Sequence, residues 1–410
     1  MSLNHHILAK AATDAVLDKF KKAEWHFGNG LGQGFYRVGT SADFPSPDAT
    51  FYDTESKALA SFEFKPHTET KRGILTGVGQ SIAYLQDSDI SYLIAPRMLG
   101  DYRIGSYLVD LYASQIYKKI PTGLILYYND YPAKVTLEHN IELLEVESVK
   151  KRKNQKIHRF WAKHQDLPLP LFHLILHYYY LGSTNMIVGD PYAVCWRERM
   201  VPPSVLNDLK TVAIYDLSGA VITTPAGSKP LVFLEKIIPK LSGGFNEKQS
   251  ALKQKIDDKY SGDNYYNSIR KNFLSFIKSM QMIDSENHLT EVGFKLYHLG
   301  VVNGAKSKVF TDYFTKELLT TGHHLDLLLD LDIYKQHNIN KSIDSILNLM
   351  EHEYESKGYI ERNPNRRQAV VSKVSFLKYE RILWKALNLI DADYTIQWRR
   401  ITEICSLPDL

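Results

Sequence analysis

The sequence contains few of the features that stabilise proteins by means other than ordinary hydrophobic packing. Its 410 residues include only two cysteines, which excludes a disulfide scaffold and any all-cysteine metal site. The longest apolar run, residues 167–181, is interrupted by two prolines and two histidines. It is also shorter than the roughly 20 residues that a bilayer span requires. We therefore expect a soluble, cytoplasmic protein.

The sequence also lacks a strong excess of charge of one sign. There are 50 lysines and arginines against 46 aspartates and glutamates, which leaves a net charge of +4. This balance excludes a histone-like polycation, so any basic surface must be local. Hydrophobic residues make up 44% of the chain and aromatic residues 12%, which is enough to bury real cores. The length suggests two or three domains.

Residues 1–150 alternate between strand and helix patterns. The predicted elements are, in order, a helix over 7–24, a glycine-punctuated segment over 28–39, strands over 49–52 and 59–65, a helix over 68–86, a strand over 91–95, a helix over 104–117 and a strand over 122–127. A polar turn joins the first two strands into a hairpin. This order predicts an α/β domain with a mixed central sheet flanked by helices.

The composition changes after Val146 to a basic segment, residues 150–163, in which Phe160 and Trp161 are interleaved with lysines and arginines. Such a segment is typical either of a phosphate-contacting surface or of a solvated interdomain helix. We place a domain boundary there. The rest of the chain is divided into an intermediate region over 151–235 and two mainly helical portions over 236–322 and 323–410.

Each helical portion resembles a winged-helix unit. In the first, an amphipathic helix around 269–280 precedes a turn flanked by short apolar pieces over 282–293. In the second, an apolar stripe over 343–354 precedes two predicted strands joined by a basic tip over 363–367. Winged helices place a helix in the major groove and a basic hairpin on the DNA backbone or minor groove. The candidate DNA-binding residues are Arg270, Lys271, Lys278, Arg366 and Arg367. The alternative is a pair of scaffolding domains with ordinary surface charge.

The residues that carry chemistry are concentrated in the predicted hairpin. Strand alternation presents Glu63 and Lys65 on one face, opposite two phenylalanines that we expect to be buried. Asp48, on the neighbouring strand, can lie beside Glu63, so two carboxylates converge with an ammonium group next to them. Oxygen ligands of this kind suit Mg²⁺, which keeps several waters for a phosphate substrate. Metal-bound water is a strong nucleophile near neutral pH, and Lys65 could orient it or stabilise charge at the phosphate.

The helix predicted after the hairpin carries an unusual stripe. Its apolar face is formed by Ile74, Leu75, Val78, Ile82 and Leu85. Flanking or opposite this face lie Gly73, Gly77, Gln80 and Tyr84. The two glycines would let a large ligand approach the helix, and the amide and hydroxyl groups would offer it polar contacts.

Together these residues resemble the PD-(D/E)xK nuclease superfamily. The matching motifs are Pro47-Asp48, Glu63-Phe64-Lys65 and Gln80-Ser81-Ile82-Ala83-Tyr84, and the resemblance covers roughly the first 150 residues. The resemblance implies that Asp48 and Glu63 bind the metal and that Lys65 is the catalytic lysine. It also implies that Gln80 and Tyr84 border the site, where we expect Gln80 to be a catalytic residue and Tyr84 to contact DNA.

Two further carboxylates could belong to the metal site. Some members of the superfamily add an acidic residue from the first helix, for which Glu24 is the candidate here. Asp53 could in principle replace Asp48. It lies in the predicted hairpin turn, however, where a solvated aspartate is the ordinary expectation.

Two other patterns suggest ligand sites but have simpler explanations. The glycine-rich run 28–34 lacks the Gly-Lys-Ser/Thr ending and the strand-to-helix setting of a phosphate-binding loop, so we interpret it as a flexible loop that could lie near DNA. The second pattern comprises His323, His324, Asp326, Asp330 and Asp332. Interleaved leucines make this segment a predicted buried helix with polar edges.

The first functional hypothesis is a Mg²⁺-dependent DNA endonuclease of the type II restriction kind. It would hydrolyse phosphodiester bonds with its N-terminal domain and recognise double-stranded DNA with its C-terminal domains. Cutting both strands with one site per chain favours a homodimer. One alternative is a nuclease of repair, recombination or transposition, whose target is set by DNA structure or by a partner protein. Another is a non-catalytic winged-helix DNA-binding protein with a decayed nuclease domain.

Overall fold

The computed structural model of the protein describes residues 3–39, 46–141, 159–164, 168–200, 214–222, 268–360 and 376–408. The chain forms two compact units, each assembled from two separate stretches of sequence. Unit 1 consists of Met1–Trp161 and His323–Phe376, and unit 2 consists of Ala162–Gly322 and Leu377–Leu410. These units do not follow the predicted division into consecutive domains over 1–150, 151–235, 236–322 and 323–410.

The centre of unit 1 is a six-stranded mixed sheet whose strands lie in sequence order. The strands are β1 (Phe35–Val38), β2 (Ala49–Asp53), β3 (Leu59–Phe64), β4 (Ile90–Pro96), β5 (Thr122–Tyr128) and β6 (Tyr131–His139). Strands β3, β4 and β5 are mutually parallel, and the remaining neighbours are antiparallel. The predicted mixed sheet and its β2–β3 hairpin are confirmed.

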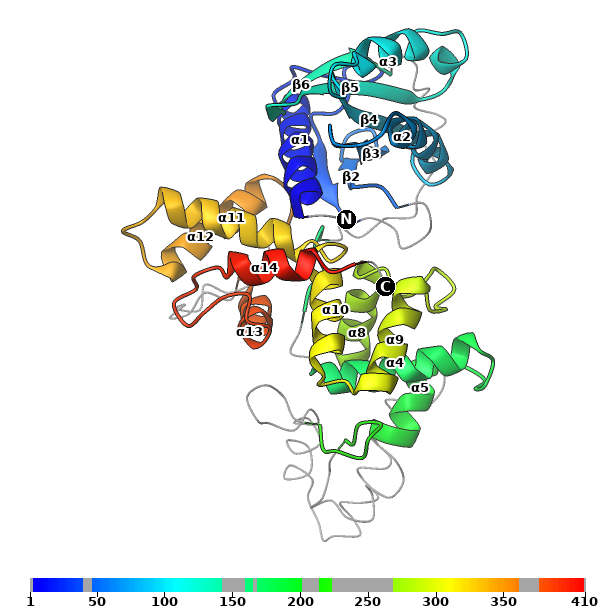
Figure 1. Ribbon diagram of the computed structural model, residues 1–410, viewed down its shortest axis with the longest axis vertical. Helices are drawn as coiled ribbons and strands as arrows, with labels where there is room; N and C mark the ends of the chain where they lie inside the picture. The colour runs from blue at the N-terminus through cyan, green and yellow to red at the C-terminus, as the bar shows by residue number, and fades with distance from the viewer. Residues whose placement is uncertain are drawn as a thin grey trace. The chain divides into compact units, whose positions relative to one another are not determined.

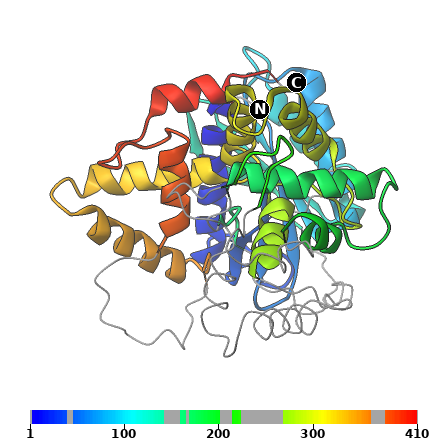
Figure 2. The same cartoon turned by 90° about the horizontal axis from the view of Figure 1, so that it is seen from below.

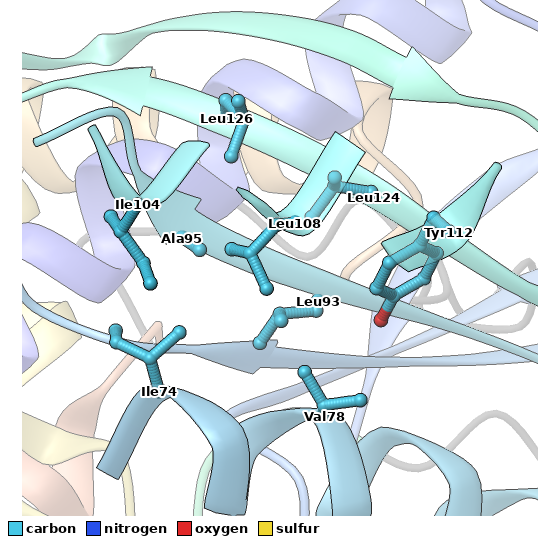
Figure 3. Packing of buried hydrophobic residues seen from close by; sticks show 9 residues of the cluster. All are labelled: Ile74, Val78, Leu93, Ala95, Ile104, Leu108, Tyr112, Leu124 and Leu126. Carbon is cyan, nitrogen blue, oxygen red and sulfur yellow. The ribbon is translucent and has the colours of Figure 1, made fainter. Parts of the chain in front are cut away.

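Helices cover both faces of this sheet (Figure 1). They are α1 (Leu3–Lys21), α2 (Lys71–Ala83) and α3 (Ile104–Tyr112), with short 3₁₀ turns at Tyr84–Gln86 and Tyr117–Lys119. Figure 3 shows the core that α2 and α3 share with β4 and β5: Ile74, Val78, Leu93, Ala95, Ile104, Leu108, Tyr112, Leu124 and Leu126. On the other face Phe20 of α1 lies edge-on to Phe35 and Tyr92. Residues of β4 therefore alternate between the two helical layers, as strand geometry requires.

Three local expectations are wrong. Strands β1 and β6 were not predicted, because β1 is a four-residue strand with three consecutive buried residues and most residues of β6 are only partly buried, so neither shows a clean alternation. Leu75, assigned to the apolar face of α2, is 45% exposed. The side of α2 that faces the sheet instead includes Gly77 and Ser81, which are small and buried.

The second stretch of unit 1 contains α11 (His324–His337) and α12 (Ile343–Ser356), which pack against each other. The buried leucines of α11 confirm the predicted buried helix. Two of its aspartates pair with the N-terminal stretch: Asp326 contacts Arg37 of β1 at 3.1 Å, and Asp330 contacts Lys10 of α1 at 3.0 Å. These ion pairs place residues 323–376 in the same unit as the sheet. The predicted 323–410 domain is therefore divided between the two units.

Charge pairing also determines how Asp326 ionises. Burial opposes ionisation of this carboxyl, but the Arg37 guanidinium and a hydrogen bond with His323 hold its pKa well below its ordinary value. Both side chains of the Arg37–Asp326 pair are at most 7% exposed. A pair buried this deeply leaves an uncompensated charge if one partner is removed.

Unit 2 is mainly helical in its described residues. Its helices are α4 (Leu169–Ser183), α5 (Pro191–Cys195), the π-helical turn Trp196–Met200, α8 (Ser268–Ser279), α9 (Glu291–Asn303), α10 (Lys308–Leu319), α13 (Lys378–Ala386) and α14 (Trp398–Cys405). Helix α9 packs against α4 and α10 (Figures 1 and 2). Nowhere along the described chain does a helix combine the length and the apolar character needed to cross a membrane.

One hairpin type occurs three times among the described residues of unit 2. Isolated bridges join Tyr215 to Val221, Ile283 to Leu289 and Ile390 to Ile396. In each copy an aspartate follows the first bridge partner: Asp216, Asp284 or Asp391. Its carboxylate accepts hydrogen bonds from the backbone N–H groups of the residues two and four positions later. The second and third copies each join two helices, α8 to α9 and α13 to α14. The turn predicted over 282–293 is the second copy, and the predicted basic tip over 363–367 lies outside the described residues.

We expect the substitution Asp326→Asn to lower the free energy of unfolding by about 3–5 kcal/mol, because it leaves the buried Arg37 charge unpaired. Urea denaturation followed by circular dichroism measures this. The matched control is Asp344→Asn, on the exposed face of α12 in the same unit, which should change stability by less than about 0.5 kcal/mol. Equal stabilities of the two variants would show that the pair does not hold the two stretches of unit 1 together.

Candidate active site

The antiparallel register of β2 and β3 brings two carboxylates together. Ala49 lies opposite Phe62, so Asp48, immediately before β2, is adjacent to Glu63 on the neighbouring strand. Asp48 Oδ2 accepts a hydrogen bond of 2.7 Å from the backbone N–H of Phe64. Glu63 is only 4% exposed, whereas the sequence suggested that its charge would be presented at the surface. Helix α2 covers this face of the strand and removes the carboxyl from solvent.

Lys65 follows β3 and completes the predicted trio. Its ammonium group lies 2.7 Å from Glu63 Oε1, and its backbone N–H donates to Ile94 O of β4. A Cβ atom on Gly77 would lie 2.7 Å from Lys65 Cε. The absent side chain of Gly77 therefore makes room for Lys65 itself, and not for an approaching ligand as the sequence suggested.

Helix α2 also supplies the polar residues of the Gln-xxx-Tyr pattern. The hydroxyl of Tyr84, just past the helix, contacts Glu63 Oε2 and lies 3.1 Å from the carbonyl of Ser46. Gln80 lies one turn earlier, and its Oε1 atom is buried with no hydrogen-bond partner in the described structure. Tyr84 thus faces the Glu63 carboxylate, and its phenol is buried away from the surface on which DNA was expected.

The two carboxyl groups ionise differently. Burial and the negative charge of Asp48 raise the pKa of Glu63 to about 7, against the opposing effects of Lys65 and Tyr84. For Asp48, burial is outweighed by hydrogen bonds from His5 and the Phe64 backbone and by the Lys65 charge, which together lower its pKa. Neighbouring carboxyls with divergent pKa values are typical of sites built for acid–base or metal chemistry.

His5 is a member of this site that sequence reasoning missed. Its Nε2 atom lies 3.2 Å from Asp48 Oδ1, and its ring stands edge-on to Phe64 with centroids 5.5 Å apart. It comes from α1, 43 residues before Asp48, and belongs to no recognisable motif. Only the packing of α1 on the sheet reveals it.

The two alternative carboxylates lie elsewhere. Glu24 is past the C-terminal end of α1 and pairs with Lys19, whereas His5, which contacts Asp48, is near the other end of a helix about 28 Å long. Asp53 lies at the far end of β2 from Asp48. It is fully buried and not solvated, because its carboxylate accepts hydrogen bonds from the backbone and hydroxyl of Ser56 in the hairpin turn.

The donor set fits a hard cation in its chemistry. Two adjacent carboxylates, Asp48 and Glu63, provide oxygen ligands. Burial and the negative charge of Asp48 raise the pKa of Glu63, and a bound cation would offset that charge. No cluster of three or more histidine, cysteine or acidic side chains suited to a metal occurs in the described ranges. Mg²⁺ is commonly held by one or two carboxylates together with waters and substrate phosphate, so two are sufficient.

The predicted DNA-binding residues are only partly visible. Arg270 lies 2.7 Å from Asp190, whose carboxylate caps α5, and Lys278 is exposed near the end of α8. The side chain of Lys271, together with Arg366 and Arg367, lies outside the described structure.

The aromatic residues of the basic segment have a structural role. Phe160 and Trp161 are at most 3% exposed. The Phe160 ring packs against Tyr359 and beneath the Arg37 guanidinium. These two aromatics therefore belong to the core of unit 1 and not to a phosphate-contacting surface.

Comparison of the chain with protein-family models and with curated proteins gives no match. Chemical inference therefore depends on the geometry of the chain's own residues. That geometry joins Asp48, Glu63, Lys65, Tyr84 and His5 in one connected set of contacts.

In the metal-free protein we expect Glu63 to make stability depend on pH. Its pKa is raised from 4.5, so its stabilising contribution is complete below about pH 4.5 and is lost as the pH rises through about 7. Relative to the variant Glu63→Gln, the wild type should lose roughly 1–3 kcal/mol of unfolding free energy between pH 5 and pH 8. Urea denaturation in EDTA measures the difference, with Glu55→Gln in the exposed hairpin turn as the control. If the difference in unfolding free energy between the wild type and Glu63→Gln does not vary with pH, the pKa of Glu63 is not raised.

Proposed function

We propose that the protein is a Mg²⁺-dependent DNA endonuclease that hydrolyses phosphodiester bonds at the β2–β3 hairpin. The observation that carries this proposal is the strand register that sets Asp48 beside Glu63, with the Lys65 ammonium on the Glu63 carboxylate. The same residues are those in which the sequence resembles PD-(D/E)xK nucleases.

The contacts of each residue support a distinct role. Asp48 and Glu63 would hold the cation, which when bound neutralises phosphate charge and acidifies a coordinated water. His5 and the Phe64 backbone position Asp48 from one side, and Tyr84 positions Glu63 from the other. Lys65 places its ammonium group beside the Glu63 carboxylate, where it would stabilise negative charge developing on the phosphate.

Unit 2 is proposed to choose where DNA is cut. Its mainly helical composition and the hairpins between α8 and α9 and between α13 and α14 support a nucleic-acid-binding role of the winged-helix kind. One active site per chain favours a homodimer when both strands of a duplex are cut, as in type II restriction enzymes.

Cleavage of supercoiled plasmid DNA in the presence of Mg²⁺ tests the enzymatic proposal. We expect Lys65→Ala and Asp48→Asn to reduce the cleavage rate by at least about 100-fold, because each removes charge from the reacting centre. The controls are Lys118→Ala and Asp110→Asn, which are exposed residues of the same unit and should cleave like the wild type. Wild-type protein that binds DNA but cuts none of many sequences would contradict the proposal, as would undiminished cleavage by Lys65→Ala.

A second measurement is independent of cleavage. Mg²⁺ held by Asp48 and Glu63 should displace the proton from Glu63 and so lower its apparent pKa below about 7. Infrared difference spectroscopy of the carboxylate stretch, with Glu63→Gln as the reference, follows this titration with and without the ion. An unchanged midpoint at millimolar Mg²⁺ would show that the cation does not bind these residues.

A further inference from the structure

Exposed tyrosines are concentrated in one part of unit 1. Among the described residues five tyrosines are exposed: Tyr102 (41%), Tyr107 (43%), Tyr128 (39%), Tyr131 (63%) and Tyr215 (46%). Four of these five lie within the 30 residues from Tyr102 to Tyr131. Single exposed aromatics need no explanation, but a cluster indicates a binding surface.

Three of the four tyrosines lie beside one another at the C-terminal ends of the parallel strands. Tyr102 is in the loop after β4, and its backbone pairs with Leu99. Tyr128 and Tyr131 flank the β5–β6 turn and are partners in its register. Asn129 in that turn donates a hydrogen bond of 2.9 Å to the carbonyl of Met98, which joins the turn to the Tyr102 loop.

Cations lie directly on these aromatic rings. Lys71 Nζ is 3.7 Å from the centroid of Tyr102, and Lys134 Nζ is 4.4 Å from that of Tyr128. Both lysines are exposed, and neither forms an ion pair with a described carboxylate. Arg97 also stacks on Tyr128, but Glu138 neutralises it. We call Lys71, Tyr102, Tyr128, Tyr131 and Lys134 the tyrosine–lysine surface.

The tyrosine–lysine surface lies close to the candidate active site. Tyr127, the neighbour of Tyr128, stacks on Phe64 and donates its hydroxyl to the carbonyl of Lys65 at 3.1 Å. On the other side, Lys71 begins α2, and Gly77 of the same helix contacts Lys65. Lys71 and Gly77 are about 9 Å apart along the helix axis. A strand lying on this surface would therefore reach the Lys65 ammonium within a few nucleotides.

Exposed tyrosine rings with lysines at their faces match the chemistry of an unpaired nucleic-acid strand, because a base that stacks on a ring displaces the lysine and leaves its charge available to a phosphate. Bases stack on tyrosine rings whatever their identity, and lysines neutralise the intervening phosphates. An intact duplex hides its base faces and offers such rings only its edges and backbone. We propose that the tyrosine–lysine surface binds a single-stranded segment of DNA and leads it into the candidate active site. This inference rests on the proposed nuclease function and narrows its substrate to DNA with unpaired segments, such as flaps, branches or frayed ends.

Fluorescence anisotropy in EDTA tests the inference without any cleavage. The full-length protein is titrated onto a labelled oligothymidine of about 20 nucleotides and onto a blunt duplex of equal length. We expect single-strand binding to depend on the tyrosine–lysine surface, and duplex binding through unit 2 to be independent of it. Tyr102→Ala and Tyr131→Ala should each weaken single-strand binding by about five- to 100-fold, whereas Tyr131→Phe, which keeps the ring, should bind normally. Tyr107→Ala, at comparable exposure in α3 of the same unit but outside the tyrosine–lysine surface, is the matched control and should bind like the wild type.

The outcomes separate this inference from the nuclease proposal. If Tyr102→Ala and Tyr131→Ala bind the single strand as well as Tyr107→Ala does, the tyrosine–lysine surface is not a single-strand site. The nuclease proposal would be unaffected, because it rests on Asp48, Glu63 and Lys65. The converse result is also possible: the protein binds single strands in EDTA through the tyrosines but never cleaves DNA. This result would support single-strand binding by the tyrosine–lysine surface and contradict the proposed nuclease activity. Circular dichroism of each variant confirms that the fold is retained.

Discussion

The pairing of β2 with β3 in a single register is the constraint on which the candidate site depends. Because side chains alternate along a strand, a slip of one residue would turn Glu63 to the α1 face and separate it from Asp48. The register instead buries two neighbouring carboxyls, an arrangement that is unfavourable by itself. Contacts from Lys65, Tyr84, His5 and the Phe64 backbone offset this repulsion. The fold thus holds together charges that would separate in a flexible chain, as functional sites commonly require.

A second set of buried charges determines which parts of the chain form unit 1. Arg37 and Lys10, from the sheet and from α1, pair with Asp326 and Asp330 of α11, and Tyr354 of α12 donates its hydroxyl to Asp330. Such pairs contribute little net stability compared with apolar packing, but they tolerate few alternative partners. They therefore specify that residues 323–376 join the N-terminal sheet. Helix α1 links the two charge sets, since it carries both Lys10 and His5.

The sequence predicted features that depend on neighbouring residues, such as the β2–β3 hairpin. It did not predict which side chains contacts from distant segments would bury. The β2–β3 hairpin follows from strand alternation around a polar turn, and that alternation was enough to select Asp48, Glu63 and Lys65 as neighbours. The charge and aromatic content of residues 150–163 predicted a solvent-facing segment, but Phe160 is a core residue. Asp53 was expected in solvent, yet the turn folds back and gives its carboxylate buried donors.

By itself, the sequence determined the order of strands β2 to β5 with their helices and the close approach of two carboxylates and a lysine, because these depend on side-chain periods within about 20 residues. Only the tertiary structure decided that His5 contacts Asp48, that Lys65 occupies the space at Gly77, and that burial raises the pKa of Glu63 to about 7. It also decided that the exposed tyrosines after β4 and β5 form one surface. Each of these features is produced by packing between segments far apart in the chain, and local periodicity carries no information about which distant segments meet.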